Sequence, residues 1–234
     1  MMSGKRWGYV VQFFCLLVFL GMSPFLIKMD GRKTMSVSSD SVRSQNVSDE
    51  VKPVVALTFD DGPNASSTPI LLDGLKERKV RATFFLIGEN VEKDENEKIV
   101  KRMYEEGHLI GNHTYTHCNL SKLETGEAKK ELEQTDTVIE KITGKQPVFV
   151  RAPYGELPVD SEQDLNRIYI GWTVDPLDWM TEDTGAVVKT VVEEINPGDV
   201  ILLHDCYKSS VEAALRIVDL LKAEGFEFVT VDKL

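Results

Sequence analysis

The chain has 234 residues, of which 42% are hydrophobic, enough for one domain of ordinary size with a short extension and too few for two large domains. Residues 1–50 hold six Lys or Arg against four Asp or Glu, whereas residues 51–234 hold 21 against 34, a net charge of −13. This second part has no basic stripe that would neutralise phosphates, which argues against nucleic-acid binding.

Residues 8–27 (GYVVQFFCLLVFLGMSPFLI) carry no charge and follow Lys5 and Arg6. Because roughly 20 apolar residues span a bilayer, the run predicts a transmembrane signal-anchor, with residues 1–7 in the cytoplasm. The run is longer than a usual signal-peptide core and no small-residue cleavage site follows it, which favours an anchor over a cleaved signal peptide. Residues 28–51 are rich in polar side chains and predict a flexible linker, so the folded domain should cover 52–234.

Apolar runs alternate with amphipathic stretches throughout residues 52–234, which predicts an α/β fold with a parallel sheet. The alternation fits an open sheet or a barrel, and seven strand units favour a barrel one unit short of eight. Several expected helices are followed by residues that commonly end helices, namely Gly107, Gly144, Gly225 and the pair Pro197-Gly198. The expected strands are 54–59, 82–87, 108–112, 148–152, 168–174, 199–204 and 226–231, and the expected helices are 67–79, 90–106, 124–142, 186–195 and 209–224, with a weaker one at 158–166.

Chemically capable residues lie at the carboxyl ends of these strands, where the loops of a parallel α/β fold collect active sites. Asp60 and Asp61 follow the first strand in TFDDGP, a pattern that alone is also typical of a surface turn. Adjacent residues of an extended chain point to opposite sides, so the two carboxylates should have different roles. One can bind a metal while the other faces a substrate.

His113 and His117 follow the third strand in HTYTH, at a spacing that brings both imidazoles to one side. Two imidazoles with one of the two carboxylates make a three-ligand site with open positions, which suits Zn²⁺ and also non-haem Fe²⁺. The histidine pair alone would be equally consistent with a structural role.

Arg151 and His204 end two further strands, and Asp178 follows another. Arg151 could pair with Asp60, and Asp178 could hold one nitrogen of His204 and favour its protonated form. A metal, a carboxylate base and a histidine acid suit hydrolysis with a poor leaving group such as an amine. There is no GxSxG nucleophile elbow, so direct attack by water is the simpler mechanism.

Five ordered motifs resemble the polysaccharide deacetylase family, also described as NodB-homology or carbohydrate esterase family 4 enzymes, over about residues 52–234. They are TFDDG at 58–62, HTYTH at 113–117, RAPYG at 151–155, DPLDW at 175–179 and LLHD at 202–205. The resemblance implies a distorted (β/α)7 barrel and metal-dependent removal of acetyl groups from N-acetylated sugars. The implied ion is zinc, with cobalt, manganese, nickel or iron as alternatives.

The resemblance also implies roles for single residues. Asp60 would be the base, oriented by Arg151, and His204 the acid, tuned by Asp178. The implied metal ligands are Asp61, His113 and His117, and the implied substrate-binding residues are Tyr154, whose N–H would stabilise the oxyanion, and Trp179 and Leu202, which would wall the acetyl pocket. Cys118 and Cys206 adjoin two of the histidines, where the family requires no thiol.

The expected substrate is the N-acetylglucosamine of cell-wall peptidoglycan, reached by a single-pass protein whose catalytic domain lies outside the cytoplasm, or by a secreted one if the anchor is cleaved. Chitooligosaccharides, an exopolysaccharide or xylan are alternatives within the family. A catalytically silent sugar-binding protein and a two-carboxylate glycosidase are the alternatives from other classes.

Overall fold

The structure is a computed structural model, and it describes residues 52–93, 95–159, 161 and 166–234. The expected anchor at 8–27 and the linker at 28–51 lie outside these residues. In the part of the chain that is described, no helix combines the length and the apolar character needed to cross a membrane.

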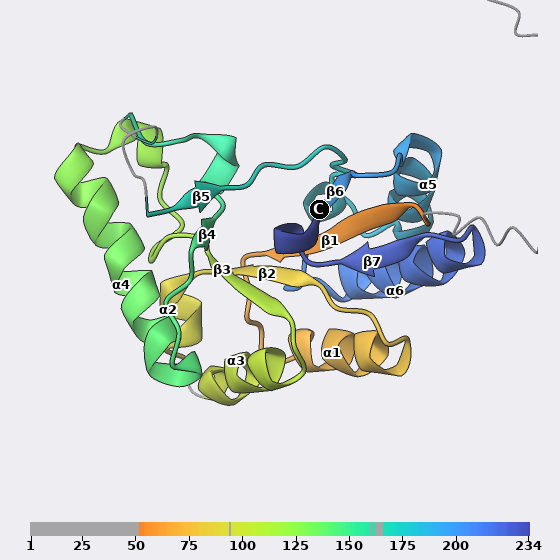
Figure 1. Cartoon of the computed structure of the whole chain (residues 1–234), viewed down its shortest axis with the longest axis horizontal. Coiled ribbons are helices and arrows are strands. Elements are labelled where there is room, and N and C mark those ends of the chain that lie inside the picture. The colour runs from red at the N-terminus through yellow and green to blue at the C-terminus, as the bar shows by residue number, and fades with distance from the viewer. Residues whose placement is uncertain (1–51, 94, 160, 162–165) are drawn as a thin grey trace, which may run out of the picture. The chain divides into compact units, whose positions relative to one another are not determined.

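The described residues form one sheet of seven strands, and every pairing between its strands is parallel (Figure 1). The order across the sheet is β5-β4-β3-β2-β1-β6, and β7 pairs with the first half of β1. The strands are β1 (Val54–Asp60), β2 (Thr83–Leu86), β3 (Leu109–Asn112), β4 (Phe149–Val150), β5 (Ile168–Tyr169), β6 (Val200–His204) and β7 (Glu227–Val229).

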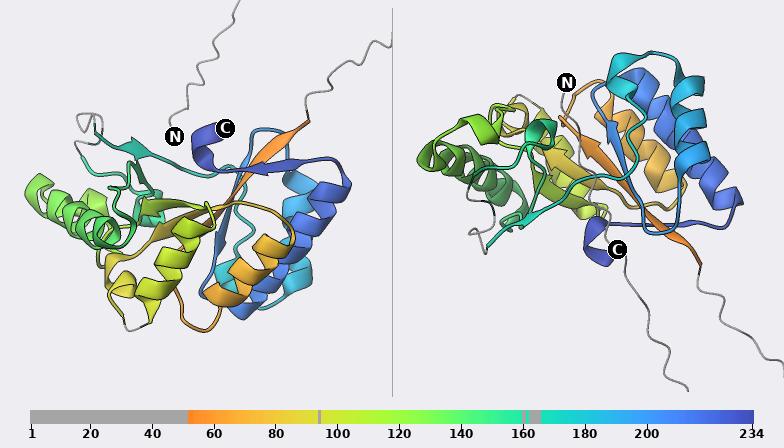
Figure 2. Two further views of the ribbon diagram at one scale, coloured as in Figure 1. Left: turned by 60° about the horizontal axis from the view of Figure 1, so that its bottom comes forward. Right: turned by 90° about the horizontal axis from the view of Figure 1, so that it is seen from above.

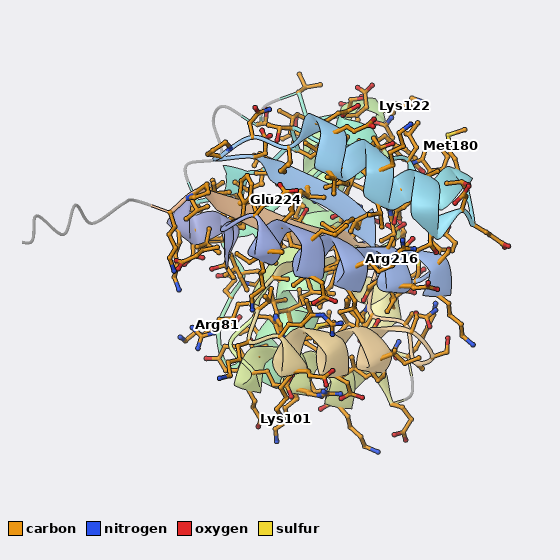
Figure 3. The ribbon with its side chains drawn as sticks, turned by 90° about the vertical axis from the view of Figure 1, so that its right-hand side faces the viewer. Arg81, Lys101, Lys122, Met180, Arg216 and Glu224 are labelled. Carbon is orange, nitrogen blue, oxygen red and sulfur yellow. The ribbon has the colours of Figure 1, made fainter. Side chains whose placement is uncertain are left out.

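Helices cover the outer face of this sheet, and along it α5, α6, α1, α3 and α4 each contact the next (Figures 1 and 2). Their outward faces are charged, as Lys101 on α3 and Arg216 on α6 illustrate (Figure 3). Asp183 caps α5, since its side chain accepts a hydrogen bond from the N–H of Ala186. The helices are α1 (Thr68–Glu77), α2 (Gly88–Val91), α3 (Asn96–Glu105), α4 (Thr125–Thr143), α5 (Thr184–Glu194) and α6 (Lys208–Ala223).

The two faces of strand β1 have different surroundings. Val55, Leu57 and Phe59 belong to the main hydrophobic core, which also contains the buried residues of α1 and α6. Because side chains alternate along a strand, Thr58 and Asp60 point to the opposite, concave face, where both contact Arg151. The helix side of β1 therefore packs in the main core, and the opposite side presents Thr58 and Asp60 near the carboxyl end of the strand.

The expected strand at 168–174 is divided between two partners. Its first residues form β5 and pair with β4, whereas Val174 pairs with Ile201 of β6 at the other edge of the sheet. The sheet is therefore curled, because one segment reaches both of its edges. This curl brings the carboxyl ends of β1, β3, β4 and β6 around one concave surface.

The single helix expected over 90–106 is wrong, since the chain forms the short α2 and then α3. Between them Glu95 has a φ of 65°, a left-handed conformation that a helix cannot contain. The weaker helix expected at 158–166 falls largely outside the described residues. The expected helix ends at Gly107, Gly144 and Gly225 are confirmed, because all three have a positive φ at or just after a C-cap.

Candidate active site

All ten candidate site residues lie at the carboxyl-end edge of the sheet or in the loops that follow it. Asp60 and His204 are the last residues of β1 and β6, and they are paired in register. His113 and Arg151 directly follow β3 and β4. The parallel arrangement thus brings together residues that are up to 144 positions apart in the chain.

The turn after β1 directs Asp61 toward the histidines. Asp61 has a φ of 70°, so the chain leaves the extended conformation at this residue. The strict alternation expected for two adjacent strand residues is therefore broken, and both carboxylates face His113, Asp60 at 3.7 Å and Asp61 at 3.4 Å. Asn90 supports the turn by donating a hydrogen bond to the carbonyl of Asp61 at 2.7 Å.

The loop after β3 folds His117 back onto His113. Thr114 and His117 have φ values of 65° and 59°, and the two imidazole centroids are 5.0 Å apart. Glu131 of α4 holds the tip of the loop, because its Oε2 accepts hydrogen bonds from the backbone N–H groups of Tyr115 and Thr116. The i,i+4 spacing therefore brings the rings together through two left-handed residues and not through a helix.

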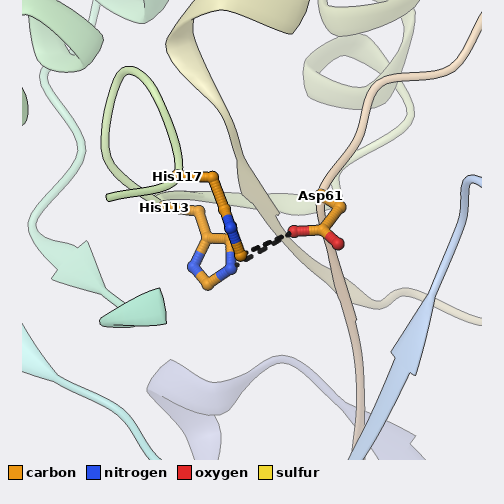
Figure 4. Close-up of side chains that lie close together, drawn as sticks. All are labelled: Asp61, His113 and His117. Atoms are coloured by element: carbon orange, nitrogen blue, oxygen red, sulfur yellow. Dashed lines mark ion pairs between the residues drawn. The ribbon is translucent and has the colours of Figure 1, made fainter. Parts of the chain in front are cut away.

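Asp61, His113 and His117 form a group whose possible ligand atoms all lie within 4.8 Å of one another (Figure 4). Asp61 Oδ1 lies 3.4 Å from His113 Nε2 and 3.3 Å from His117 Nε2. Two ligands that are each about 2.0–2.1 Å from a zinc ion at the tetrahedral angle are about 3.4 Å apart, so this spacing fits a metal.

The surroundings of the three side chains also fit a metal. Asp61 Oδ1 is buried and has no hydrogen-bond partner among the described residues. His113 Nδ1 lies 2.7 Å from the carbonyl oxygen of Arg151, so Nδ1 donates its proton there and Nε2 is the nitrogen that faces Asp61. Without an ion, burial lowers the pKa of His113, but the charge of Asp60 and the hydrogen bond and charge of Asp61 outweigh burial and raise it. Burial lowers the pKa of His117 below the usual histidine value, which favours the neutral ring that binds metals.

Asp60 is held by a buried arginine. Arg151 is fully buried, its Nη1 donates to Asp60 Oδ1 at 2.9 Å and to Thr58 Oγ1 at 2.7 Å, and its guanidinium lies 4.3 Å from the ring centroid of Phe85. The sequence suggested the ion pair but not its burial. A carboxylate fixed in this way keeps one oxygen, Oδ2, directed at His113.

His204 is held by a second buried carboxylate. Asp178 Oδ1 lies 2.8 Å from His204 Nδ1, and Asp178 Oδ2 accepts the backbone N–H of His204 at 2.8 Å. Burial lowers the pKa of His204, but the hydrogen bond and charge of Asp178, with the charges of Asp60 and Asp61, outweigh it and raise the pKa to about 9. The ring is therefore protonated at neutral pH, and Nε2 faces Asp61 Oδ2 at 4.0 Å.

The three expected substrate-binding residues surround this centre. Tyr154 has a φ of 63° and is exposed, with its ring centroid 4.9 Å from that of His117. Trp179 is half exposed, in the turn that also contains Asp178. Leu202 is buried two residues before His204, opposite Thr58 in the register, and therefore faces the concave side.

The sequence did not indicate the burial of one further acidic residue beside the site. Asp205 is fully buried, and burial raises the pKa of its carboxyl to about 7 although a hydrogen bond from Thr68 lowers it. The only signal in the sequence is an acidic residue directly after an apolar strand. Cys118 and Cys206 are free thiols, and Cys206 lines a hollow of about 200 Å³ beside Asp61.

The chain is similar to several known deacetylases. A protein named peptidoglycan-N-acetylglucosamine deacetylase from Bacillus cereus is 41% identical over 190 residues, which cover 78% of this chain and 68% of that protein. Peptidoglycan-N-acetylmuramic acid deacetylase PdaC from Bacillus subtilis is 38% identical over 194 residues, 83% of this chain and 41% of that protein, so the chain spans less than half of the length of this relative.

Solved structures share the fold. The structure of PdaC matches with a TM-score of 0.75 at 38% identity, over 78% of this chain and 90% of the other. A family 4 acetyl xylan esterase from Clostridium thermocellum, solved in complex with a cobalt ion, matches with a TM-score of 0.72 at 33% identity, over 77% of this chain and 89% of the other. The family model described as polysaccharide deacetylase matches residues 48–170, just over half of the chain. The chain therefore belongs to the polysaccharide deacetylase family of metal-dependent hydrolases.

Proposed function

We propose that the protein is a membrane-anchored enzyme that hydrolyses the N-acetyl groups of N-acetylglucosamine in cell-wall peptidoglycan and releases acetate. The proposal rests above all on three groups that meet at one edge of the sheet. These are a three-ligand cluster, a carboxylate held by buried Arg151, and an imidazole held by buried Asp178.

Asp61, His113 and His117 would hold one divalent ion, for which zinc is proposed and cobalt, manganese, nickel and iron are alternatives. A carboxylate with two imidazoles suits all of these ions. When bound, the ion would polarise the acetyl carbonyl group and lower the pKa of an adjacent water.

Asp60 is the proposed base. It takes a proton from water as the water oxygen adds to the carbonyl carbon of the acetyl group. Arg151 orients Asp60, since its guanidinium is buried and hydrogen-bonded to the carboxylate. The backbone N–H of Tyr154 would help to stabilise the negative charge that develops on the carbonyl oxygen.

His204 is the proposed acid. The amide C–N bond breaks as His204 gives its proton to the departing nitrogen, so the products are the free amine and acetate. An amine is a poor leaving group unless it is protonated, and the pKa of about 9 at His204 provides that proton at neutral pH. Trp179 and Leu202 would enclose the acetyl methyl group, one from the exposed rim and one from the buried strand.

Peptidoglycan is the proposed polymer because the similar proteins described above carry that substrate in their names. The test is to load the full-length protein with Zn²⁺, Co²⁺ or Mn²⁺ and to measure acetate released from peptidoglycan, chitooligosaccharides and acetylated xylan. We expect release from peptidoglycan, and mass spectrometry of the fragments after muramidase digestion should locate the missing acetyl group on glucosamine. Loss from muramic acid instead would contradict the proposed sugar, and no release from any glycan would contradict the enzymatic function.

The alternatives from other classes give different results in the same assay. A sugar-binding protein without turnover would retain glycan and release no acetate, whereas a glycosidase would produce new reducing ends. The variant Asp60→Asn serves as the control, since it removes the base without removing a proposed metal ligand. It should abolish acetate release while the metal content stays at the wild-type level.

The proposed location is the outer surface of the cell membrane, with residues 8–27 as the anchor and residues 28–51 as the tether. A flexible tether of this size reaches about 25–29 Å on average, so the substrate should lie near the membrane. Protease treatment of intact cells should remove the catalytic domain and leave the anchor in the membrane fraction. A domain protected in intact cells would contradict this location.

A further inference from the structure

Asp205 has no part in the proposed reaction, yet it lies directly beneath the metal-binding turn. It follows His204 at the end of β6 and is completely buried. In the pairing of β6 with β1, His204 lies opposite Asp60. The next residues along the two strands are therefore Asp205 and Asp61. Here Asp61 turns away with its φ of 70°, and Asp205 fills the space behind the turn.

One hydrogen-bond chain connects Asp205 to this turn. Thr68 at the start of α1 donates its hydroxyl proton to Asp205 Oδ2 at 2.5 Å. The same hydroxyl oxygen accepts the backbone N–H of Asn64 at 2.8 Å. Because a threonine hydroxyl has a single proton, the carboxylate of Asp205 fixes the direction of both hydrogen bonds. Ser67 adds a hydrogen bond from its hydroxyl to the carbonyl oxygen of Asp205 at 2.6 Å.

A close packing contact links Asp205 to the residue after Asp61. A Cβ atom at Gly62 would lie 2.5 Å from both carboxylate oxygens of Asp205, closer than real Cβ atoms approach. Gly62 does not have a positive φ, so its backbone conformation does not require glycine. The contact with Asp205 therefore explains why this position has no side chain.

The other side of the turn is held by amides. Asn90 donates to the carbonyl of Asp61 at 2.7 Å, and Asn96 donates to the carbonyl of Pro63 at 3.2 Å. A non-glycine residue with a positive φ is strained and persists only where its surroundings enforce it. Asp61 is such a residue, and its turn is enclosed between these amides and Asp205.

We propose that Asp205 is a positioning residue that holds the turn at residues 61–64, so that the carboxylate of Asp61 faces the two imidazoles. This inference rests on the metal site of the proposed function, but not on the glycan. Asp205 would then affect metal affinity without contacting the metal, by orienting Asp61. Groups that orient metal ligands typically contribute about 10- to 100-fold to affinity.

The test measures Zn²⁺ affinity of the full-length protein by competition with a coloured chelator, without any glycan present. Asp205→Ala removes the carboxylate that packs against Gly62, and Gly62→Ala adds a methyl group that would clash with that carboxylate. Each should weaken Zn²⁺ binding about 10- to 100-fold and change the visible spectrum of the Co²⁺-loaded protein. Asp205→Asn keeps the size of the side chain and an acceptor for Thr68, and should restore much of the affinity.

A double variant and a matched control separate positioning from general stability. In the double variant, Asp205→Ala makes room for the methyl group of Gly62→Ala, so the combined loss should be smaller than the product of the single losses. Gly74→Ala on α1 places a Cβ at the same 2.5 Å, but from the side chain of Leu215, and should lower thermal stability without changing Zn²⁺ affinity.

Wild-type Zn²⁺ affinity in both single variants would overturn the inference, and so would losses that multiply fully in the double variant. If Asp205→Ala does not fold, the Zn²⁺ affinities of Gly62→Ala and Asp205→Asn test the inference instead. Wild-type affinity in Gly62→Ala would then overturn it. A protein that binds Zn²⁺ as expected but releases no acetate would contradict the proposed function and leave this inference intact.

Discussion

Replacing Asp178 with asparagine should shift the protonation of His204 strongly. The pKa of His204 is about 9, against an ordinary value of 6.5, and at about 1.4 kcal/mol for each pH unit this favours the protonated ring by about 3 kcal/mol. Burial opposes this preference, and the hydrogen bond and charge of Asp178 are the largest contribution in its favour. In Asp178→Asn the pKa should therefore fall to near or below 6.5.

The measurement is a histidine NMR titration of the metal-free protein, which is simple because the chain has four histidines. The matched control is Asp175→Asn, which alters an aspartate three residues earlier that accepts the N–H of Leu177 and does not contact His204. In the metal-loaded enzyme, activity should decline at a lower pH in Asp178→Asn than in the wild type, because His204, the proposed acid, loses its proton at a lower pH.

The same pair predicts a dependence of stability on pH. Since the folded pKa of His204 is raised, its contribution to the free energy of unfolding is complete below about pH 6.5 and is lost as the pH rises through about 9. Urea unfolding of the metal-free protein should show this loss in the wild type and not in Asp178→Asn. A pKa of His204 that is unchanged in Asp178→Asn, or that falls equally in Asp175→Asn, would refute the reasoning.

Three further variants test other parts of the molecule. Arg151→Met leaves the carboxylate of Asp60 buried without its partner and should lower the free energy of unfolding by about 3–5 kcal/mol in urea; an unchanged value would show that the pair is not buried in solution. Burial lowers the pKa of His108 to about 4. The free energy of unfolding should therefore fall between pH 6.5 and 4, by up to about 1.4 kcal/mol per pH unit, and His108→Gln should reduce this fall. Burial raises the pKa of Cys206 to about 12, so Cys206→Ser should keep its activity and the wild-type thiol should react slowly with iodoacetamide at pH 8, whereas rapid alkylation or inactivity would contradict this.

Much of the architecture could be predicted because it depends on local patterns. The seven strands and most helices follow from alternating apolar runs and from the glycines that end helices. Likewise, Asp60, His113, Arg151 and His204 were expected near one another because the carboxyl ends of parallel strands share one edge.

The features of the fold that could not be predicted depend on contacts between distant segments. The break between α2 and α3 and the pairing of Val174 with β6 depend on tertiary contacts, which no local pattern encodes. The burial of Arg151 over Phe85 was also not predictable, because it depends on how strongly the sheet curls.

The sequence by itself determined which side chains are available and at which edge of the sheet they lie. Only the tertiary structure decided how the proposed metal ligands face one another, because that depends on left-handed residues, Asp61 and His117 among them. Such conformations are unfavourable for a free chain, so they form only where groups from other elements hold the turns. For Asp61 those groups include Asn90 and, as we propose, Asp205.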